Sequence, residues 1–306
     1  MFRTPARRSD WLSGLTGGDV YLKLEIVQPT SSYKIRGAFN ACLRVVEEAP
    51  GTRLVTASAG NHGRAMAHAA RELGLPLVVF IAADAPRAKV DAIRACGADL
   101  RPCRDYDDAE RQAKAFAAAG GGLFISPYSH PDVIAGAGTI GLELIENCPA
   151  LDCVVVPVGG GGLISGIAAT LAATSPRTEV FGVETAASTP FAASLAAGRI
   201  VTIDVGASIA DGLTGNLDPD TMTFDVVRQL VRGMSVVDEK AILDALAGVV
   251  AKEHVVCEGA AAVAVAALTS GAVDVRRKRA AVILTGANID PERLKEAAER
   301  SSLNGE

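Results

Sequence analysis

Aromatic residues are scarce in this 306-residue chain, where they make up 4% of the sequence and include a single tryptophan. Proteins that stack nucleic-acid bases need exposed aromatic rings, so this scarcity argues against a base-stacking surface. Positive charge is not in excess either, because the net charge is −5 and the isoelectric point is about 5.5. We therefore expect neither nucleic acid nor an anionic membrane as a partner.

Cysteine and histidine are also few, and they do not form ligand pairs. The six cysteines contain no C-x-x-C spacing and the four histidines no H-x-x-x-H spacing, so these residues predict no metal site. A chain of this size can fold without disulfides, and we interpret the thiols as reduced in a cytoplasmic protein. No apolar run is typical of a signal peptide or long enough to span a membrane. The cysteines are Cys42, Cys96, Cys103, Cys148, Cys153 and Cys257.

The order of apolar runs and amphipathic stretches indicates an α/β protein. Apolar runs typical of buried strands alternate with stretches of helical period, which is the pattern of a parallel sheet. The length allows one large domain or two smaller ones. Residues 188–225 show no clear period and are expected to be irregular. The expected strands are 20–27, 53–58, 77–82, 123–126, 153–158, 179–184 and 279–284, and the expected helices are 34–48, an alanine-rich helix ending at 73, 88–96, 107–119, 132–146, 163–173, 239–254, 259–268 and 291–300.

The stretch from residue 31 to residue 40 places a lysine on the apolar face of a predicted helix. A helical period puts Lys34 at the head of an apolar face, ahead of Ala38, and puts Arg36 on the polar face. A lysine rarely points inward unless it is paired or its pKa is lowered, and a neutral amine is the nucleophile of Schiff-base chemistry. Alternatively, Lys34 reaches water from the first turn. This stretch alone leaves both interpretations open.

Four consecutive glycines, Gly159 to Gly162, connect a strongly apolar run to a helical stretch. Glycines let the backbone close around an anion, and the start of a helix points free N–H groups at it. A tight turn alone would need only one or two glycines. Glu184 follows where a ribose-binding acid would lie, but no third glycine and no Walker A lysine occur in register. The loop therefore fits a single phosphate better than a dinucleotide.

Two further strand ends carry polar side chains. Ser58, Asn61 and His62 offer a hydroxyl, an amide and an imidazole at a helix start, which suits a carboxylate or a phenolate. A capped helix with a satisfied histidine is the alternative there. Thr285 leaves the end of a buried strand, where a simple turn is the alternative.

In chain order, short motifs resemble those of the fold type II pyridoxal-phosphate enzymes, specifically the threonine/serine dehydratase and serine racemase family. The matching motifs are Ser-Tyr-Lys-Ile-Arg-Gly-Ala at 32–38, Ser-Ala-Gly-Asn-His-Gly at 58–63, Pro-Tyr at 127–128, Val-Ile-Ala-Gly-Ala-Gly-Thr-Ile at 133–140, the four glycines at 159–162, Ile-Ala-Asp-Gly at 209–212, Glu-Gly-Ala at 258–260 and Thr-Gly-Ala-Asn at 285–288.

This resemblance implies a fold like that of the tryptophan synthase β chain: two α/β domains, each with a parallel sheet, and the cofactor in the cleft between them. It implies a large cofactor-binding domain of residues 1–52 and 131–306, with residues 53–130 inserted as a small domain. It implies no C-terminal regulatory domain. A homodimer or a dimer of dimers is expected, in keeping with the general frequency of symmetric oligomers.

The resemblance also implies roles for individual residues. Lys34 would bind pyridoxal 5'-phosphate as a Schiff base and then remove the α-proton of the substrate. Thr285 would face the pyridine nitrogen, where a neutral hydroxyl leaves the cofactor a weaker electron sink and favours rapid loss of a β-leaving group. The other implied roles are Tyr33 beside the ring, Asn61 at the ring O3', Gly159, Gly160, Gly161, Gly162 and Leu163 around the phosphate, Ser58, Asn61 and His62 at the substrate carboxylate, and Asp211 and Glu258 as supporting groups.

The implied reaction is α,β-elimination from a β-hydroxy amino acid, with L-threonine and L-serine first, to give a 2-oxo acid and ammonia. The enzyme alternatives are a dehydratase for a hydroxyectoine-derived or 3-hydroxyaspartate-type substrate, and a serine racemase. The non-enzyme alternative is a phosphate- or nucleotide-binding module. Racemases of the family carry a serine as second base where this chain has Ala59, which favours elimination. Many members bind a divalent cation with an acid like Glu184 and an aspartate where this chain has Pro190, so no metal is expected.

Overall fold

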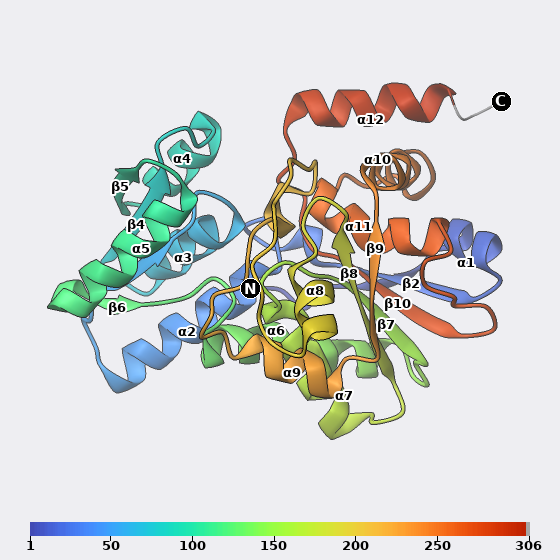
Figure 1. The fold of residues 1–306 in the computed structure, drawn as a ribbon, viewed down its shortest axis with the longest axis horizontal. Helices are drawn as coiled ribbons and strands as arrows, with labels where there is room; N and C mark the ends of the chain where they lie inside the picture. Colours follow the sequence, from blue (N-terminus) through green and yellow to red (C-terminus); the bar gives the residue numbers. More distant parts are fainter. Residues whose placement is uncertain (304–306) are drawn as a thin grey trace. The chain divides into compact units, whose positions relative to one another are not determined.

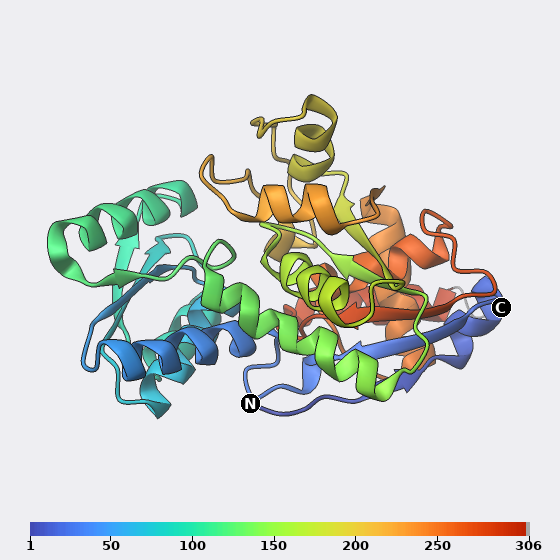
Figure 2. The same ribbon diagram turned by 90° about the horizontal axis from the view of Figure 1, so that it is seen from below.

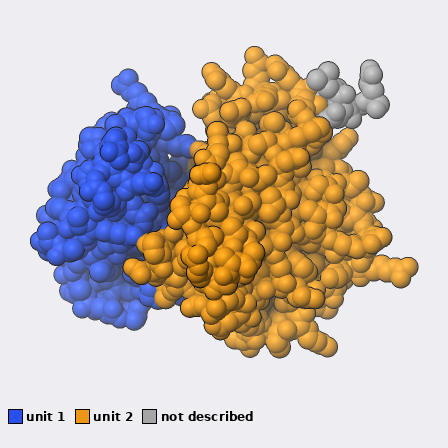
Figure 3. All heavy atoms as spheres, viewed as in Figure 1, with its two compact units in different colours: residues 1, 28–137 blue, residues 2–27, 138–306 orange. Residues whose placement is uncertain are grey.

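The computed structural model describes residues 1–303, which contacts divide into two units (Figure 3). Unit 1 consists of Met1 and Gln28–Ala137, and unit 2 consists of Phe2–Val27 and the chain from Gly138 onward. Residues 304–306, the end of the expected large domain, lie outside the described residues. Each unit has its own sheet and its own apolar core.

Unit 1 is built on a four-stranded parallel sheet with the strand order β5-β4-β3-β6 (Figure 1). Its strands are β3 (Leu54–Ala57), β4 (Leu77–Ala82), β5 (Asp99–Cys103) and β6 (Leu123–Phe124). Its helices are α2 (Lys34–Glu48), α3 (Asn61–Glu72), α4 (Arg87–Arg94), α5 (Tyr106–Phe116) and the π-helical turn η2 (Ala117–Gly121), and α6 (Pro131–Asn147) begins in this unit and ends in unit 2.

The side chains of β4 alternate between two apolar layers. Leu77, Val79 and Ile81 join the layer formed with α2 and α3. Val78 and Phe80 join the layer formed with α5. Because successive side chains leave opposite faces of a strand, an unbroken apolar run is buried on both sides. Figure 2 shows α5 on one side of this sheet and α2 with α3 on the other.

Helix α2 belongs to unit 1 because its apolar face packs on α3. Ile35, Ala38 and Ala41 share one core cluster with Ala65 and Ala69 of α3. The contact division therefore places residues 28–52 with the smaller sheet, beside the segment from 53 to 130.

Unit 2 is built on a six-stranded sheet with the order β1-β2-β10-β7-β8-β9 (Figure 1), in which only β1 runs antiparallel to its neighbour. Its strands are β1 (Ala6–Arg8), β2 (Asp19–Leu24), β7 (Cys153–Pro157), β8 (Glu179–Thr185), β9 (Gly233–Val237) and β10 (Arg279–Leu284). Its helices are α1 (Asp10–Thr16), η1 (Glu25–Val27), α7 (Gly162–Thr174), α8 (Pro190–Ala197), η3 (Asp211–Leu213), α9 (Thr223–Leu230), α10 (Glu239–Gly248), η4 (Val249–Glu253), α11 (Gly259–Thr269) and α12 (Pro291–Leu303).

The core of unit 2 lies between this sheet and α11. The helix reads Gly-Ala-Ala-Ala-Val-Ala-Val-Ala-Ala-Leu-Thr, and its residues 259–268 are all buried. A helix that is apolar all round is stable only inside a core, and its small side chains let α10 and the strands approach it closely. Together α1, α10 and α11 cover one face of the sheet, while α7 lies on the other (Figure 1).

Some sequence expectations are corrected by the fold. Arg36 was expected on the polar face of α2 but is 1% exposed, because that part of the helix is enclosed on more than one side. The region 188–225, expected to be irregular, contains α8, η3 and the start of α9. All six cysteines are free in this structure, and five of them are buried. Within the described part of the chain, the helices offer no apolar stretch of the length that a bilayer crossing requires.

Candidate active site

Lys34 is the first residue of α2 and follows a strained turn. Ser31 has a φ of 54°, and the hydroxyl of the buried Ser32 accepts a hydrogen bond from the Lys34 N–H. The Lys34 Nζ donates a 2.7 Å hydrogen bond to the carbonyl oxygen of Pro127 and lies 5.3 Å from the centre of the Tyr33 ring. The amine is therefore held by a backbone acceptor of its own unit rather than reaching freely into water.

The turn from β3 into α3 brings a second set of polar groups to unit 1. The Ser58 hydroxyl accepts from the Gly60 N–H at 3.2 Å, and α3 then begins at Asn61. A Cβ atom at Gly63 would lie 1.9 Å from the Ser58 carbonyl oxygen, so only glycine allows this close turn. The N-cap residue of this helix is Gly60, which has no side chain to cap it. The start of a helix carries partial positive charge, which suits the substrate carboxylate that the sequence predicts here.

His62 points into the interior of unit 1. Its side chain is buried, and neither ring nitrogen meets a hydrogen-bond partner among the described residues. Burial, together with the nearby Lys34 charge, lowers the pKa of His62 well below its ordinary value, although the backbone of Ile125 opposes this shift. His62 is therefore neutral, and its contact with a substrate carboxylate stays a prediction.

The four glycines of unit 2 form the junction between β7 and α7. Gly161 adopts the left-handed conformation, with φ 84° and ψ −2°, at the position before the helix begins. A Cβ atom at Gly161 would lie 2.5 Å from Cζ of Phe191, so no side chain fits there. The Thr223 hydroxyl donates to the Gly160 carbonyl oxygen at 2.9 Å and so holds the loop at the residue before Gly161.

The N-terminal end of α7 is open. Helices α1, α5 and α10 are capped by side chains of Ser9, Asp105 and Asp238, whereas no described side chain caps α7. A helix start with free N–H groups carries partial positive charge and binds anions, above all phosphate. The geometry agrees with the single phosphate that the sequence predicts.

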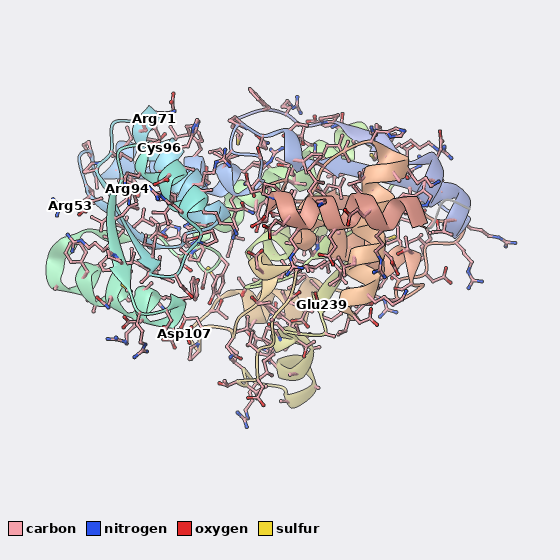
Figure 4. The ribbon with its side chains drawn as sticks, turned by 90° about the horizontal axis from the view of Figure 1, so that it is seen from above. Arg53, Arg71, Arg94, Cys96, Asp107 and Glu239 are labelled. Atoms are coloured by element: carbon pink, nitrogen blue, oxygen red, sulfur yellow. The ribbon has the colours of Figure 1, made fainter. Side chains whose placement is uncertain are left out.

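A segment from residue 209 to residue 213 lies beside the glycine loop. A Cβ atom at Gly159 would lie 3.1 Å from Cα of Leu213, and one at Gly259 would lie 2.2 Å from the Ile209 carbonyl oxygen. Glu239 at the start of α10, labelled in Figure 4, holds the beginning of this segment. Its carboxylate accepts hydrogen bonds from the Ser208 hydroxyl and from the Ile209 N–H, at 2.5 and 2.9 Å.

Thr285 directly follows β10, the strand next to β7. Because the two strands are parallel, Thr285 and the glycine loop leave the same edge of the sheet. The hydroxyl-bearing side chain is 4% exposed. Glu258 precedes α11 and donates its N–H to the Gly286 carbonyl oxygen at 2.9 Å. Asp211 lies in the segment beside Gly159, so both expected supporting acids occur at this edge.

Glu184 is a fully buried acid near the end of β8. Its two carboxylate oxygens accept the N–H groups of Phe191 and Ala192, at 2.8 and 2.9 Å. Burial raises the pKa of the Glu184 carboxyl to about 7, against the effect of these two hydrogen bonds. Residues 1–303 contain no group of three or more histidine, cysteine, aspartate or glutamate side chains placed to hold a metal ion.

The expected site residues thus form one group in each unit. Unit 1 brings together Lys34, Tyr33 and the turn that carries Asn61, and unit 2 brings together the glycine loop and Thr285. Sequence reasoning missed the Pro127 carbonyl as the partner of Lys34 and the side chains that brace the loop. The Pro127-Tyr128 motif was a sequence signal for the partner of Lys34. No sequence signal pointed to the side chains that hold the loop, since Phe191 and Thr223 lie in the stretch expected to be irregular.

A family model described as "Pyridoxal-phosphate dependent enzyme" matches residues 1–286 of the chain. The chain belongs to this family. Its fold is fold type II, and its relatives are threonine dehydratases and serine racemases, so the resemblance, the α/β fold with two parallel sheets and the cofactor are all confirmed.

Three known proteins illustrate the range of this similarity. The L-threonine ammonia-lyase of Thermotoga maritima is 40% identical over 289 residues, which cover 94% of this chain and 72% of the relative. The beta-hydroxyaspartate dehydratase of Paracoccus denitrificans is 35% identical over 293 residues, which cover 95% and 92%. The structure of maize serine racemase matches with a TM-score of 0.90 at 32% identity, covering 99% of this chain and 93% of that one.

The residues present fit pyridoxal phosphate. Lys34 supplies the amine that such a cofactor binds through, and Tyr33 supplies an aromatic ring next to that amine. The glycine loop supplies a turn that any side chain would fill and an uncapped helix start for the phosphate.

Proposed function

We propose that this enzyme is an ammonia-lyase that converts β-hydroxy amino acids, with L-threonine and L-serine first, into 2-oxo acids and ammonia. The observation that carries the proposal is the amine of Lys34, held at the Pro127 carbonyl, while Ala59 offers no second group for proton transfer. The similarity to an L-threonine ammonia-lyase supports the same reaction class.

In this proposal, each group of residues would hold a part of the cofactor. In unit 1, Lys34 would bind it covalently, Tyr33 would lie beside its ring and Asn61 would donate to its ring oxygen. In unit 2, the N–H groups of Gly159, Gly160, Gly161, Gly162 and Leu163 would bind a phosphate, and Thr285 would face a pyridine nitrogen. When bound, the cofactor withdraws electrons from the substrate Cα and so acidifies the proton there.

The protein side of the reaction follows from these positions. With the substrate amine bound in place of Lys34, the freed amine of Lys34 would take the Cα proton as a general base. The β-hydroxyl leaves as water, and hydrolysis of the released enamine returns a water, so the net products are a 2-oxo acid and ammonia. Thr285 is a neutral partner that does not stabilise a long-lived carbanion, which favours elimination over reactions that need one.

Ala59 distinguishes elimination from racemisation. Racemisation needs a second acid or base on the opposite face of Cα to return a proton there. The methyl group of Ala59 packs against the apolar cluster of unit 1 and carries no exchangeable proton. Ser58, Asn61 and His62 are proposed to bind the substrate carboxylate at the start of α3, where the helix dipole favours an anion. A dimeric assembly and a cytoplasmic location stay predictions.

A panel of β-hydroxy amino acids tests this proposal, with 2-oxo acid formation measured directly. L-threonine and L-serine are expected to give 2-oxo acid, and D-serine is expected to form from L-serine more slowly than pyruvate does. Activity confined to 3-hydroxyaspartate or to a hydroxyectoine-derived amino acid would replace the proposed substrate. Faster formation of D-serine than of pyruvate would replace elimination by racemisation.

A further inference from the structure

The glycine loop is braced by a side chain from a helix that the reaction does not use. The Phe191 ring is fully buried, and its tip lies where a Cβ atom at Gly161 would stand, at 2.5 Å for Cζ and 2.9 Å for Cε2. Cβ of Thr223 lies near the same point, at 3.0 Å. The space that a side chain at Gly161 would occupy is therefore filled by Phe191 and Thr223.

Phe191 is itself fixed by Glu184. Phe191 is the second residue of α8, after Pro190, and the hydroxyl of Thr189 does not cap this helix. Instead the Glu184 carboxylate accepts the N–H groups of Phe191 and Ala192, one on each oxygen. A carboxylate at a helix start satisfies otherwise unpaired N–H groups and interacts favourably with the helix dipole. This contact sets the position of the first turn of α8.

Glu184 is well placed to relate α8 to the loop. Pro157 and Val183 are partners in the pairing of β7 with β8, and the Val158 N–H donates to the Val183 carbonyl oxygen at 2.8 Å. Val183 belongs to the core shared with α11, so the next side chain, Glu184, points to the opposite face. That face carries α7, the helix that the loop precedes. The ends of two neighbouring strands thus hold the loop and its brace in fixed register.

We propose that Glu184 is a positioning residue for the cofactor phosphate: it fixes the first turn of α8, and through Phe191 it holds the left-handed turn at Gly161. The inference rests on the proposed role of the loop as the phosphate site. Neither Glu184 nor Phe191 touches the phosphate. They act on it by keeping the loop N–H groups aligned, which is the condition for several weak N–H contacts to add up.

The test compares pyridoxal phosphate with pyridoxal, which has the same ring and aldehyde but no phosphate. The holoenzyme is stripped of cofactor, and the dissociation constants of both ligands are measured at about pH 8, above the Glu184 pKa of about 7. The ratio of the two constants is the phosphate preference. Ring binding and bond formation at Lys34 are common to both ligands and cancel in this ratio.

Glu184→Gln and Phe191→Leu are each expected to lower the phosphate preference about tenfold, the scale of one hydrogen bond to a charged group. Their binding of pyridoxal should change little. The phosphate preference of the double variant should fall no further than that of the more affected single variant, because both residues act on Gly161 through the same set of contacts. Should Glu184→Gln fail to fold, Phe191→Leu decides alone, since it leaves the backbone of α8 intact.

Glu253→Gln is the matched control. Glu253 is another buried acid of unit 2, and its carboxylate accepts hydrogen bonds from Arg7 and Ser9, which belong neither to the loop nor to α8. Its replacement should lower the melting temperature without changing the phosphate preference. Variants at 184 and 191 that keep the wild-type preference, or that lose both ligands equally, would overturn the inference. A wild-type enzyme with no phosphate preference would instead overturn the proposed role of the loop itself.

Discussion

The Nζ atom of Lys34 donates to the carbonyl oxygen of Pro127 at 2.7 Å, across 93 residues of sequence. This bond joins the first residue of α2 to a backbone carbonyl in the loop after β6. A carbonyl oxygen only accepts hydrogen bonds and has no proton of its own, so the amine is the member of this pair that can exchange a proton with a substrate.

Replacement of Lys34 by arginine should show whether activity needs the proton transfer by the amine or only the hydrogen bond to the Pro127 carbonyl. Lys34→Arg can still donate to the Pro127 carbonyl, but a guanidinium cannot deprotonate, so activity should fall by about 10³-fold or more while the fold persists. Formation of 2-oxo acid and the melting temperature are the measurements. Lys240→Met removes an exposed lysine paired with Asp244 and should leave activity unchanged. Full activity in Lys34→Arg would disprove the assignment.

Alanine at Gly161 should cost both stability and cofactor binding. An alanine would be strained in the left-handed conformation, and its methyl group would lie 2.5 Å from the Phe191 ring. We therefore expect ~3 kcal/mol of destabilisation and loss of bound cofactor. Gly198 offers the matched control, because it has a φ of 69° with open space around it. Gly198→Ala should cost about 1 kcal/mol and retain the cofactor. Urea unfolding and the cofactor content of the purified proteins measure both; equal losses would contradict the brace at Gly161.

The buried His62 predicts a loss of stability in acid. Its pKa is well below 6.5 in the folded state and near 6.5 in the unfolded chain, so the unfolded state binds more protons as the pH falls below 6.5. Its contribution is thus fully present above pH 6.5 and is lost as the pH falls toward the folded pKa, with a slope of up to about 1.4 kcal/mol per pH unit. The free energy of unfolding of wild type and of His62→Gln should converge toward lower pH. Parallel curves would show that folding does not lower the pKa of His62.

Removing one partner of the buried Lys23–Glu143 ion pair in unit 2 should strongly lower the free energy of unfolding. The Lys23 side chain is 0% exposed, and its Nζ lies 2.6 Å from both Glu143 Oε2 and the Thr4 carbonyl oxygen. Lys23→Met leaves a buried carboxylate without this cation and should cost about 3–5 kcal/mol.

The exposed pair of Lys240 and Asp244 is the comparison, and Lys240→Met should cost less than about 1 kcal/mol. The double change Lys23→Met with Glu143→Leu should recover part of the loss, since no buried charge of the pair then remains. Urea unfolding measures all of these. A small loss in Lys23→Met alone would mean that water reaches Glu143.

Much of the fold could be predicted because the central strands of both sheets, such as β4 and β7, are continuous apolar runs. The edge strand β5 was missed, since it contains Pro102 and is only partly buried, and edge positions tolerate such residues. Helix α8 was missed because its sequence, Pro-Phe-Ala-Ala-Ser-Leu-Ala-Ala, is almost uniformly apolar and carries no helical period. Arg36 was misplaced because period alone cannot tell whether the second face of a helix is also covered.

The sequence by itself determined the family, the cofactor and the motif residues at 32–38, 58–63 and 159–162, because these depend on local chemistry that short stretches of chain carry. The tertiary structure decided what each of them touches. In the folded protein, Lys34 donates to the Pro127 carbonyl oxygen, and the Phe191 ring packs at Gly161. The Phe191 N–H in turn donates to the Glu184 carboxylate. These partners come from other parts of the chain, and a local pattern does not by itself determine which distant backbone or ring a residue will contact in the folded protein.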